Sequence, residues 1–412
     1  MDKRLKNIAV KLSNKVKERI SVIDDLQDEA VYELIEEEIF RRKDLSYLPA
    51  PTVVLLAERV FSAVRSDMDI LQKYVEDAEV SEIMVNGKDN IFIERRGKIE
   101  KTADKFDTTE ELNEVIHRVA GKVNRQISEM DPIVDARLSG GSRVNAVYGN
   151  VAIGGPAFTV RKFPKISLRM NDLIEYETIT KEAGKLLKLL VGSGYNLFIS
   201  GGTSSGKTTF LNALSDSIPT GERIVVIEDS MELKLNGLSN VVRLECKPKN
   251  AQGRGEVSMR HLIRSSLRMR PDRIIVGEVR GGEIIEMIQA MNTGHDGSLS
   301  TGHGTGVAGM LKRMEAMFLQ AGEFPVDAIR EQIAQAIDIV VQLAKIANTG
   351  RRVTEICEIV NYEAGRFKLN PIYRFTDGKL VKTHNELVNT EKMKLNGYYN
   401  EYLKWQEAST DD

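Results

Sequence analysis

The chain has 412 residues, a net charge of −2 and 42% hydrophobic residues. Its length predicts two or three domains of roughly 150 residues each, and its slight acidity argues against a protein that mainly wraps nucleic acid. The two cysteines, Cys246 and Cys357, form no C-x-x-C motif, which fits a reducing compartment and gives no metal cluster. No stretch approaches the roughly 18 apolar residues of a membrane span, and the N-terminus lacks the pattern of a signal peptide. The sequence therefore predicts a cytoplasmic protein.

Residues 1–74 are expected to form a helical N-terminal extension. Apolar residues recur there every three or four positions among many basic ones, which predicts a basic amphipathic helix: Leu5, Ile8, Leu12, Val16 and Ile20. Such a helix can lie on an anionic membrane surface, although packing on neighbouring helices is the commoner arrangement. An acidic helix over 24–38 follows, and Pro49 and Pro51 break the pattern before it resumes over 53–64.

Over residues 75–165 the helical pattern gives way to a mixture of strand and helix patterns, which predicts a compact α+β domain. The stretch 91–99 indicates a hairpin with Gly97 in its turn. A helix is expected over 108–124, with Thr108 as N-cap and Glu111 three residues later. Strands are expected over 143–147 and 158–162, and a linker over 166–172.

From residue 173 to 412, helical patterns alternate with short apolar strands, which is typical of a doubly wound α/β sheet. Two antiparallel strands are expected near the end, over 353–359 and 367–369, before a charged helical tail. The segment 138–141, Leu-Ser-Gly-Gly, resembles the signature of ABC transporter ATPases, but it precedes the nucleotide motif and is interpreted as a turn between strands.

A P-loop lies at the centre of this α/β region. Gly201, Gly206, Lys207 and Thr208 match G-x-x-x-x-G-K-[ST], between an apolar strand over 195–200 and a helical pattern over 209–215. The glycines let backbone N–H groups approach a polyphosphate, and the helix N-terminus adds a partial positive charge. The residues expected to bind ATP are Gly201, Gly202, Thr203, Ser204, Ser205, Gly206, Lys207, Thr208 and Thr209.

The remaining catalytic groups are expected at the ends of nearby strands. Lys207 suits the β- and γ-phosphates, and the Thr208 hydroxyl suits Mg²⁺. In the Walker B strand 273–278 a glycine, Gly277, stands where an aspartate is common, and Glu278 follows in a position to orient or deprotonate water. Glu228 and Asp229 end another strand; they either orient Mg²⁺-bound water or cap the following turn.

Two histidines follow in the stretch 293–305. His303 is placed to donate a hydrogen bond to a γ-phosphate, whereas His295 is either a second such group or a structural loop residue. Their spacing does not make a convincing metal site.

These four elements in this order resemble the secretion ATPase superfamily of type II and type IV secretion and type IV pilus assembly. The family's Walker A, aspartate box, Walker B and histidine box correspond to 201–208, 227–232, 274–278 and 294–303. The amino-acid sequence of residues 270–280 and 291–298 is most similar to that of the tight-adherence (Flp) pilus branch, the CpaF type. One departure is Gly304-Thr305 after His303, where the family usually has Ala-Asn.

The resemblance implies a PAS-like N-terminal domain followed by a RecA-like ATPase domain. It also implies a homo-hexameric ring at the cytoplasmic face of the inner membrane, an inner-membrane platform protein as partner, and only indirect or peripheral membrane contact. Arg143 and Arg161 match family arginines that reach the phosphates. Glu278, Lys207, Glu228, His303, Arg143 and Arg161 are thus the expected catalytic residues, with Thr208 and, through water, Glu228 at Mg²⁺.

Two other functions remain open on the sequence alone. A RecA-like nucleic-acid translocase would need a basic, aromatic-bearing groove, which 6% aromatic residues and a slightly acidic chain do not favour. A nucleotide-dependent scaffold without turnover would not need Glu278. The leading hypothesis is an ATP-hydrolysing motor for protein export or pilin assembly that binds no nucleic acid.

Overall fold

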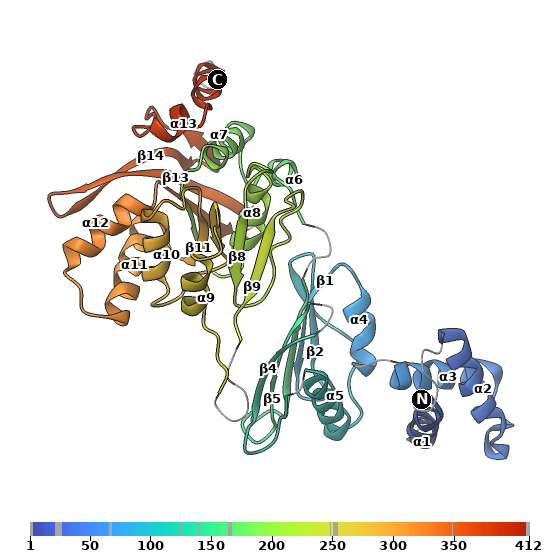
Figure 1. The fold of residues 1–412 in the computed structure, drawn as a ribbon. Helices are drawn as coiled ribbons and strands as arrows, with labels where there is room; N and C mark the ends of the chain where they lie inside the picture. Colours follow the sequence, from blue (N-terminus) through green and yellow to red (C-terminus); the bar gives the residue numbers. More distant parts are fainter. Residues whose placement is uncertain are drawn as a thin grey trace. The chain divides into compact units, whose positions relative to one another are not determined.

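The computed structural model describes residues 3–20, 27–65, 68–123, 125–138, 141–163, 167–247, 249, 254–347 and 349–408. The chain divides into two compact units, Met1–Lys165 and Ile166–Asp412. Figure 1 labels their helices and strands. The predicted linker 166–172 begins at this boundary, but Leu168 already packs on the second unit's core and helix α6 spans Met170–Glu175.

The first unit begins with a bundle of helices, α1 (Lys3–Ile20), α2 (Asp28–Phe40) and α3 (Ala50–Arg65), with a short 3₁₀ turn η1 (Lys43–Leu45). Leu12 and Val16 of α1 are buried in the core of this bundle. The apolar stripe of α1 thus packs on neighbouring helices, the second of the two expected alternatives. The acidic helix begins at Asp28, and the expected residues 24–26 lie outside the described part of the chain.

An antiparallel sheet with one covering helix forms the rest of this unit. Its strands run in the order β3-β2-β1-β6-β5-β4. The elements are η2 (Asp69–Leu71), α4 (Gln72–Glu76), β1 (Val80–Asn86), β2 (Ile91–Arg95), β3 (Lys98–Lys101), α5 (Thr109–Lys122), β4 (Ile133–Arg137), β5 (Arg143–Val147) and β6 (Ala157–Arg161). The predicted hairpin, helix and strands are confirmed, and the Thr108 hydroxyl accepts a hydrogen bond from the Glu111 N–H at 3.1 Å. Alternate residues on one face are buried with α5.

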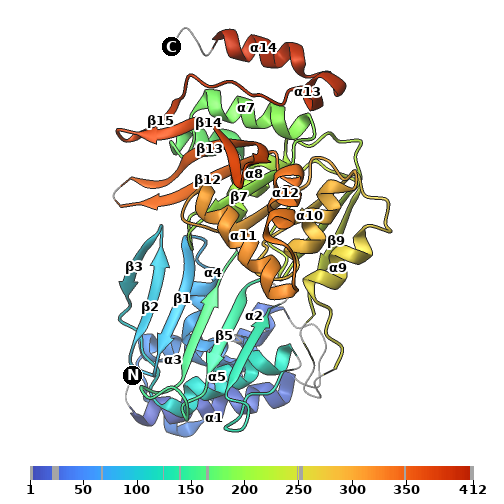
Figure 2. The same cartoon turned by 90° about the vertical axis from the view of Figure 1, so that its left-hand side faces the viewer.

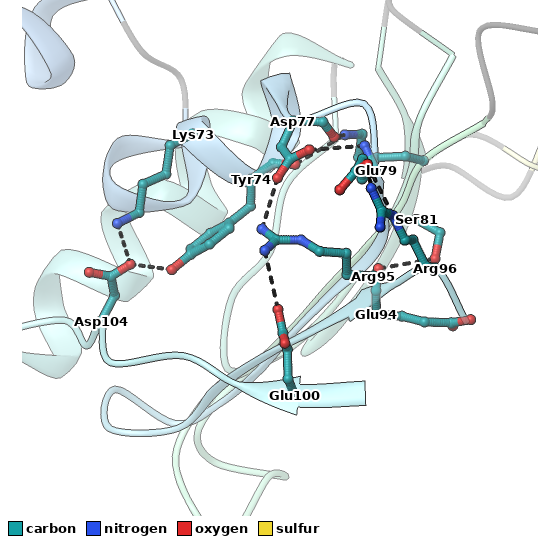
Figure 3. Close-up of polar contacts among 11 residues, drawn as sticks. Lys73, Tyr74, Asp77, Glu79, Ser81, Glu94, Arg95, Arg96, Glu100 and Asp104 are labelled. Atoms are coloured by element: carbon teal, nitrogen blue, oxygen red, sulfur yellow. Dashed lines mark hydrogen bonds and ion pairs between the residues drawn. The ribbon is translucent and has the colours of Figure 1, made fainter. Parts of the chain in front are cut away.

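Polar contacts fasten α4 to this sheet (Figure 3). The Lys73 Nζ lies 2.6 Å from an Asp104 carboxylate oxygen, which also accepts a hydrogen bond from the Tyr74 hydroxyl. Arg95 of β2 bridges Asp77, at 2.8 Å, and Glu100 of β3, at 3.5 Å. These half-exposed ion pairs contribute little energy each, but together they fix the orientation of the short helix.

The second unit is built on a nine-stranded sheet in the order β15-β14-β13-β12-β7-β11-β10-β8-β9. Six strands from β12 to β9 are parallel, and β12 to β15 pair antiparallel, as predicted for 353–359 and 367–369. The strands are β7 (Leu197–Gly201), β8 (Ile224–Glu228), β9 (Val241–Glu245), β10 (Arg273–Val276), β11 (Leu299–His303), β12 (Ile339–Ile346), β13 (Gly350–Glu363), β14 (Arg366–Thr376) and β15 (Lys379–Lys382).

Helices cover both faces of this sheet, which confirms the doubly wound pattern (Figure 2). One core contains side chains of α7 (Lys181–Gly192), α8 (Lys207–Ser215), α13 (Glu391–Leu395) and α14 (Tyr399–Ala408). The other contains side chains of α9 (Met259–Ser266), α10 (Ile284–Asn292), α11 (Val307–Ala321) and α12 (Val326–Ala336). Leu197 and Ile199 enter the first core and Phe198 the second, because successive strand residues point to opposite faces. None of the described helices is long and apolar enough to cross a membrane.

Candidate active site

The candidate active site lies at the carboxyl edge of the parallel strands. β8, β10, β11 and β7 are consecutive neighbours in the sheet, and Gly201 at the end of β7 is directly paired with His303 at the end of β11. Because parallel strands end at a common edge, the Walker A, aspartate, Walker B and histidine elements converge there.

The loop between β7 and α8 has the conformation that a P-loop requires. Ser204 and Gly206 have left-handed backbones, with φ of 58° and 94°. A Cβ at Gly201 would lie 2.7 Å from the Leu343 carbonyl oxygen, so only glycine fits there. The Ser205 hydroxyl is buried without a hydrogen-bond partner, and Thr208 and Thr209 lie half-buried in the first turn of α8. The loop therefore turns polar groups inward at a helix N-terminus.

Lys207 is almost fully buried within this loop, with 8% of its surface exposed. Its Nζ donates hydrogen bonds to the carbonyl oxygens of Gly201, at 3.2 Å, and Gly202, at 3.0 Å. It also lies 3.4 Å from Nδ1 of His303. The ammonium group thus binds backbone carbonyl oxygens at the point where a polyphosphate would supply negative charge.

A chain of polar contacts continues from Lys207 through His303 to Glu278. The His303 Nε2 lies 2.7 Å from Oε1 of Glu278. Burial lowers the pKa of His303, and the charges of Lys207 and Arg280 lower it further, whereas the charge of Glu278 raises it. The net shift is downward, which favours a neutral ring. The Lys207 ammonium can only donate, so Nδ1 accepts and Nε2 carries the proton that faces Glu278.

Arg280 holds the other oxygen of Glu278. Its Nε and Nη2 lie 2.9 Å and 2.6 Å from Oε2, and its Nη1 lies 3.6 Å from a carboxylate oxygen of Asp229. The Glu278 side chain is 19% exposed. The sequence reasoning gave Arg280 no role; its position two residues after Glu278 was the available signal.

Glu228, the last residue of β8, is buried, with 3% of its surface exposed. Its carboxylate accepts hydrogen bonds from the backbone N–H groups of Glu232, at 3.0 Å, and Leu233, at 3.1 Å. Burial raises the pKa of Glu228 to about 7. A Cβ at Gly277 would lie 2.9 Å from Cγ of Glu228. Glu228 therefore caps the turn that follows β8, and Asp229 is the more exposed acid of the pair.

Three other groups expected from the sequence belong to other segments of the chain. His295 precedes β11, at the opposite edge of the sheet from His303, and its Nδ1 lies 3.2 Å from the Ala290 carbonyl oxygen, which fits a structural loop residue. Arg143 and Arg161 lie on β5 and β6 of the first unit. The segment 138–141 connects β4 and β5, which pair antiparallel, although residues 139 and 140 are outside the described chain.

A pocket of about 310 Å³ adjoins the P-loop on the side of β12 and β13. Its wall is largely apolar, and the Arg351 Nε donates a hydrogen bond to the Ser204 carbonyl oxygen at 3.0 Å. The residues that line it include Leu168, Leu173, Tyr176, Phe210, Leu343 and Arg351. Sequence reasoning missed this pocket, because its wall combines segments far apart in the chain.

Among the described residues, no three His, Cys, Asp or Glu side chains are grouped to hold a metal ion. A cation here would depend on Thr208, on water and on oxygens of a bound nucleotide, a donor set typical of Mg²⁺ rather than of zinc.

A doubly wound sheet with a P-loop, a buried lysine and an acid at the end of a nearby strand defines a P-loop ATPase. Residues 64–391 match the family model described as Type II/IV secretion system protein. The chain belongs to this family, and it is an ATPase motor of the kind that serves type II and type IV secretion or pilus machines.

Two individual relatives and one solved structure are similar to this chain. Protein MJ0781 of Methanocaldococcus jannaschii is 37% identical over 296 residues, which cover 70% of this chain and only 40% of that protein. The conjugal transfer protein TrbB of Rhizobium radiobacter is 33% identical over 71% of this chain and 88% of its own length. The ATPase DotB of Yersinia pseudotuberculosis shares the fold with a TM-score of 0.53 at 17% identity, over 72% of this chain and 79% of that chain.

Proposed function

We propose that this chain is the assembly motor of a tight-adherence (Flp) pilus or a related secretion machine, of the CpaF type. The amino-acid sequence of residues 270–280 and 291–298 supports the tight-adherence branch. The name of the relative TrbB, a conjugal transfer protein, supports a role in a transport machine. In this proposal the second unit is a RecA-like domain and the antiparallel sheet a PAS-like domain. The chain forms a homo-hexameric ring at the cytoplasmic face of the inner membrane, where a platform protein receives the motion.

The proposal of ATP hydrolysis rests on the series of polar contacts that runs from Lys207 through His303 to Glu278 and Arg280. Lys207 is bound by backbone carbonyls, and a triphosphate would offer it stronger, charge-assisted bonds. When Lys207 turns to the phosphate, His303 loses its donor on Nδ1. Binding of a γ-phosphate thereby changes the hydrogen bonding of His303 and, through its contact with Glu278, the surroundings of that carboxylate.

Glu278 is the group proposed to act on water. It orients the attacking water and accepts its proton as the water oxygen bonds to the γ-phosphorus and the bond to ADP breaks. Arg280 fixes the carboxylate during this step. Mg²⁺, which the Thr208 hydroxyl and phosphate oxygens would hold, would neutralise phosphate charge. Arg143 and Arg161 are proposed to bind phosphate as well.

The pocket beside the P-loop is proposed to hold the nucleotide base. Its apolar wall and the ring of Tyr176 suit a planar purine, and Arg351 joins the pocket to the P-loop backbone.

Exchange of Glu278 for Gln tests this function. The amide keeps the shape but loses the basicity, so Glu278→Gln should bind ATP normally and hydrolyse it at least ~100-fold more slowly. Glu245→Gln is the matched control, because Glu245 ends β9 at the same edge, two strands away from β10; it should retain wild-type turnover. Loss of ATP affinity with an unchanged rate in the bound state would assign Glu278 to binding and refute its catalytic role.

A further inference from the structure

Gln342 lies in the middle of β12, beside the strand that leads into the P-loop (Figure 2). It is directly opposite Ser200 of β7, and Ser200 is in turn directly opposite Gly302 of β11. Gln342 is buried, with 5% of its surface exposed. Glutamine is seldom buried this deeply unless its amide has partners, so the contacts of this amide indicate what the residue does.

The Gln342 amide reaches past β7 to the residue that follows His303. Its Nε2 donates hydrogen bonds to the carbonyl oxygens of Gly304, at 3.2 Å, and Leu343, at 3.1 Å. Both partners are acceptors, so the nitrogen of the amide faces them and not the oxygen. The Gly304 N–H donates in turn to the Gly201 carbonyl oxygen at 3.4 Å. Gly304 is thus held by β12 through its carbonyl group and by the P-loop through its N–H group.

Two further polar atoms in this region are buried. Among the described residues, the Gln342 Oε1 and the Ser200 hydroxyl have no hydrogen-bond partner. A Cβ at Gly304 would clash with the Ser200 Oγ, so this hydroxyl faces the same residue as the Gln342 amide. A buried polar group without a partner destabilises a fold, and apolar residues at positions 200 and 342 would remove this loss. Polar residues at both positions therefore point to a role other than stability.

The backbone beside His303 decides whether its ring can make both of its contacts. The ring's Nδ1 lies 3.4 Å from the Lys207 Nζ, and its Nε2 lies 2.7 Å from Oε1 of Glu278. Hydrogen bonds weaken steeply as their geometry departs from the optimum, and a displacement of about 1 Å in a catalytic arrangement can lower the rate about 100-fold. A shift of Gly304 would move the adjacent backbone of His303 and weaken one contact or the other.

We propose that Gln342 is a positioning residue for ATP hydrolysis, which fixes the Gly304 carbonyl group and so orients His303 between Lys207 and Glu278. This inference rests on the proposed function, in which the contacts of His303 connect Lys207 to the group that acts on water. Gln342 acts through His303 and not on the nucleotide. Its loss should therefore lower kcat and leave the affinity for ATP unchanged, because the P-loop keeps its own phosphate-binding groups.

The test measures ATP hydrolysis by the full-length variants Gln342→Met, Gln342→Asn and Thr354→Val. Methionine has a similar length but no donor, and asparagine keeps the amide on a side chain that is one methylene shorter. We expect both to lower kcat about 10- to 100-fold, with ATP affinity within about twofold of the wild type and an unchanged unfolding temperature. Thr354→Val is the matched control, because the Thr354 hydroxyl donates to the backbone carbonyl of Gln342, at 3.3 Å. It should keep the wild-type kcat.

A double-mutant cycle with His303→Ala identifies the route of the effect. In the His303→Ala background, Gln342→Met should change kcat by less than about twofold, because the ring that Gln342 orients is absent; Gln342→Asn takes its place in the cycle should the Met variant not fold. An equal fall in kcat in both backgrounds would overturn the inference. So would a wild-type kcat in the Met and Asn variants, or a joint fall in kcat, ATP affinity and unfolding temperature, which would make the role structural.

The same measurements separate failure of this inference from failure of the proposed function. If His303→Ala loses hydrolysis while Gln342→Met and Gln342→Asn retain it, Gln342 has no positioning role and the proposed function stands. A wild-type kcat in His303→Ala would instead refute the role that the proposed function gives to His303, and this inference with it.

Discussion

Gly277 stands where an aspartate is common, and the structure predicts that even alanine at this position lowers the stability of the fold. A Cβ at residue 277 would lie 2.9 Å from Cγ of Glu228 and 3.5 Å from its Cβ. Glu228 cannot move away freely, because it is 3% exposed and accepts two backbone hydrogen bonds. Overpacking of this kind costs about 1–3 kcal/mol. In a domain of this size Gly277→Ala should lower the unfolding temperature of the second unit by roughly 2–12 °C.

Thermal unfolding followed by circular dichroism measures this change, with Gly221→Ala as control. Gly221 is exposed and has no atom within 4 Å of a Cβ position, so its variant should unfold near the wild-type temperature. The clash can be isolated in a double-mutant cycle. Gly277→Ala should cost much less in a Glu228→Ala background, where Cγ is absent. An equal loss in both backgrounds, or no loss in the single variant, would refute the reasoning.

Three further outcomes follow from the site. Lys207→Ala should reduce ATP affinity about tenfold to hundredfold, since a charge-assisted bond contributes roughly 1.5–3 kcal/mol; equilibrium binding checks this, and wild-type turnover would contradict the P-loop role. Burial raises the pKa of Glu228 from 4.5 to about 7, so the folded state binds more protons than the unfolded state between these values and stability falls as pH rises through them. Relative to Glu228→Gln, the wild type should lose up to about 3 kcal/mol of unfolding free energy across this window; denaturant titrations at several pH values measure it, and a pH-independent difference would argue against the shift. Arg351→Ala removes the bond to the Ser204 carbonyl and should raise KM for ATP roughly three- to tenfold at near-constant kcat. A fall in kcat alone would place Arg351 in the chemical step instead.

Local patterns in the sequence determined the elements and the main motif. The P-loop spacing, the alternation of apolar strands and helices, the 91–99 hairpin and the Thr108 N-cap each depend on residues within a few positions of one another. Backbone geometry links such neighbours directly, so their structure could be predicted without knowledge of the rest of the chain. The order of the four motifs was likewise sufficient to indicate the family that the match over residues 64–391 shows.

Only the tertiary structure decided how distant residues combine. Sheet order brings His303 between Lys207 and Glu278 but leaves His295 at the other edge. A Cβ at Gly304 would clash with the Ser200 hydroxyl of the neighbouring strand, which explains the glycine after His303.

The same holds for side chains whose roles depend on three-dimensional neighbours. Glu228 turns to the backbone of its own loop, and Gln342 reaches Gly304 only because β7 lies between β11 and β12. Such contacts depend on strand pairing and on the direction of each side chain, which a one-residue change in register would reverse. The sequence determined which chemical groups this protein carries, and long-range packing decided which of them meet.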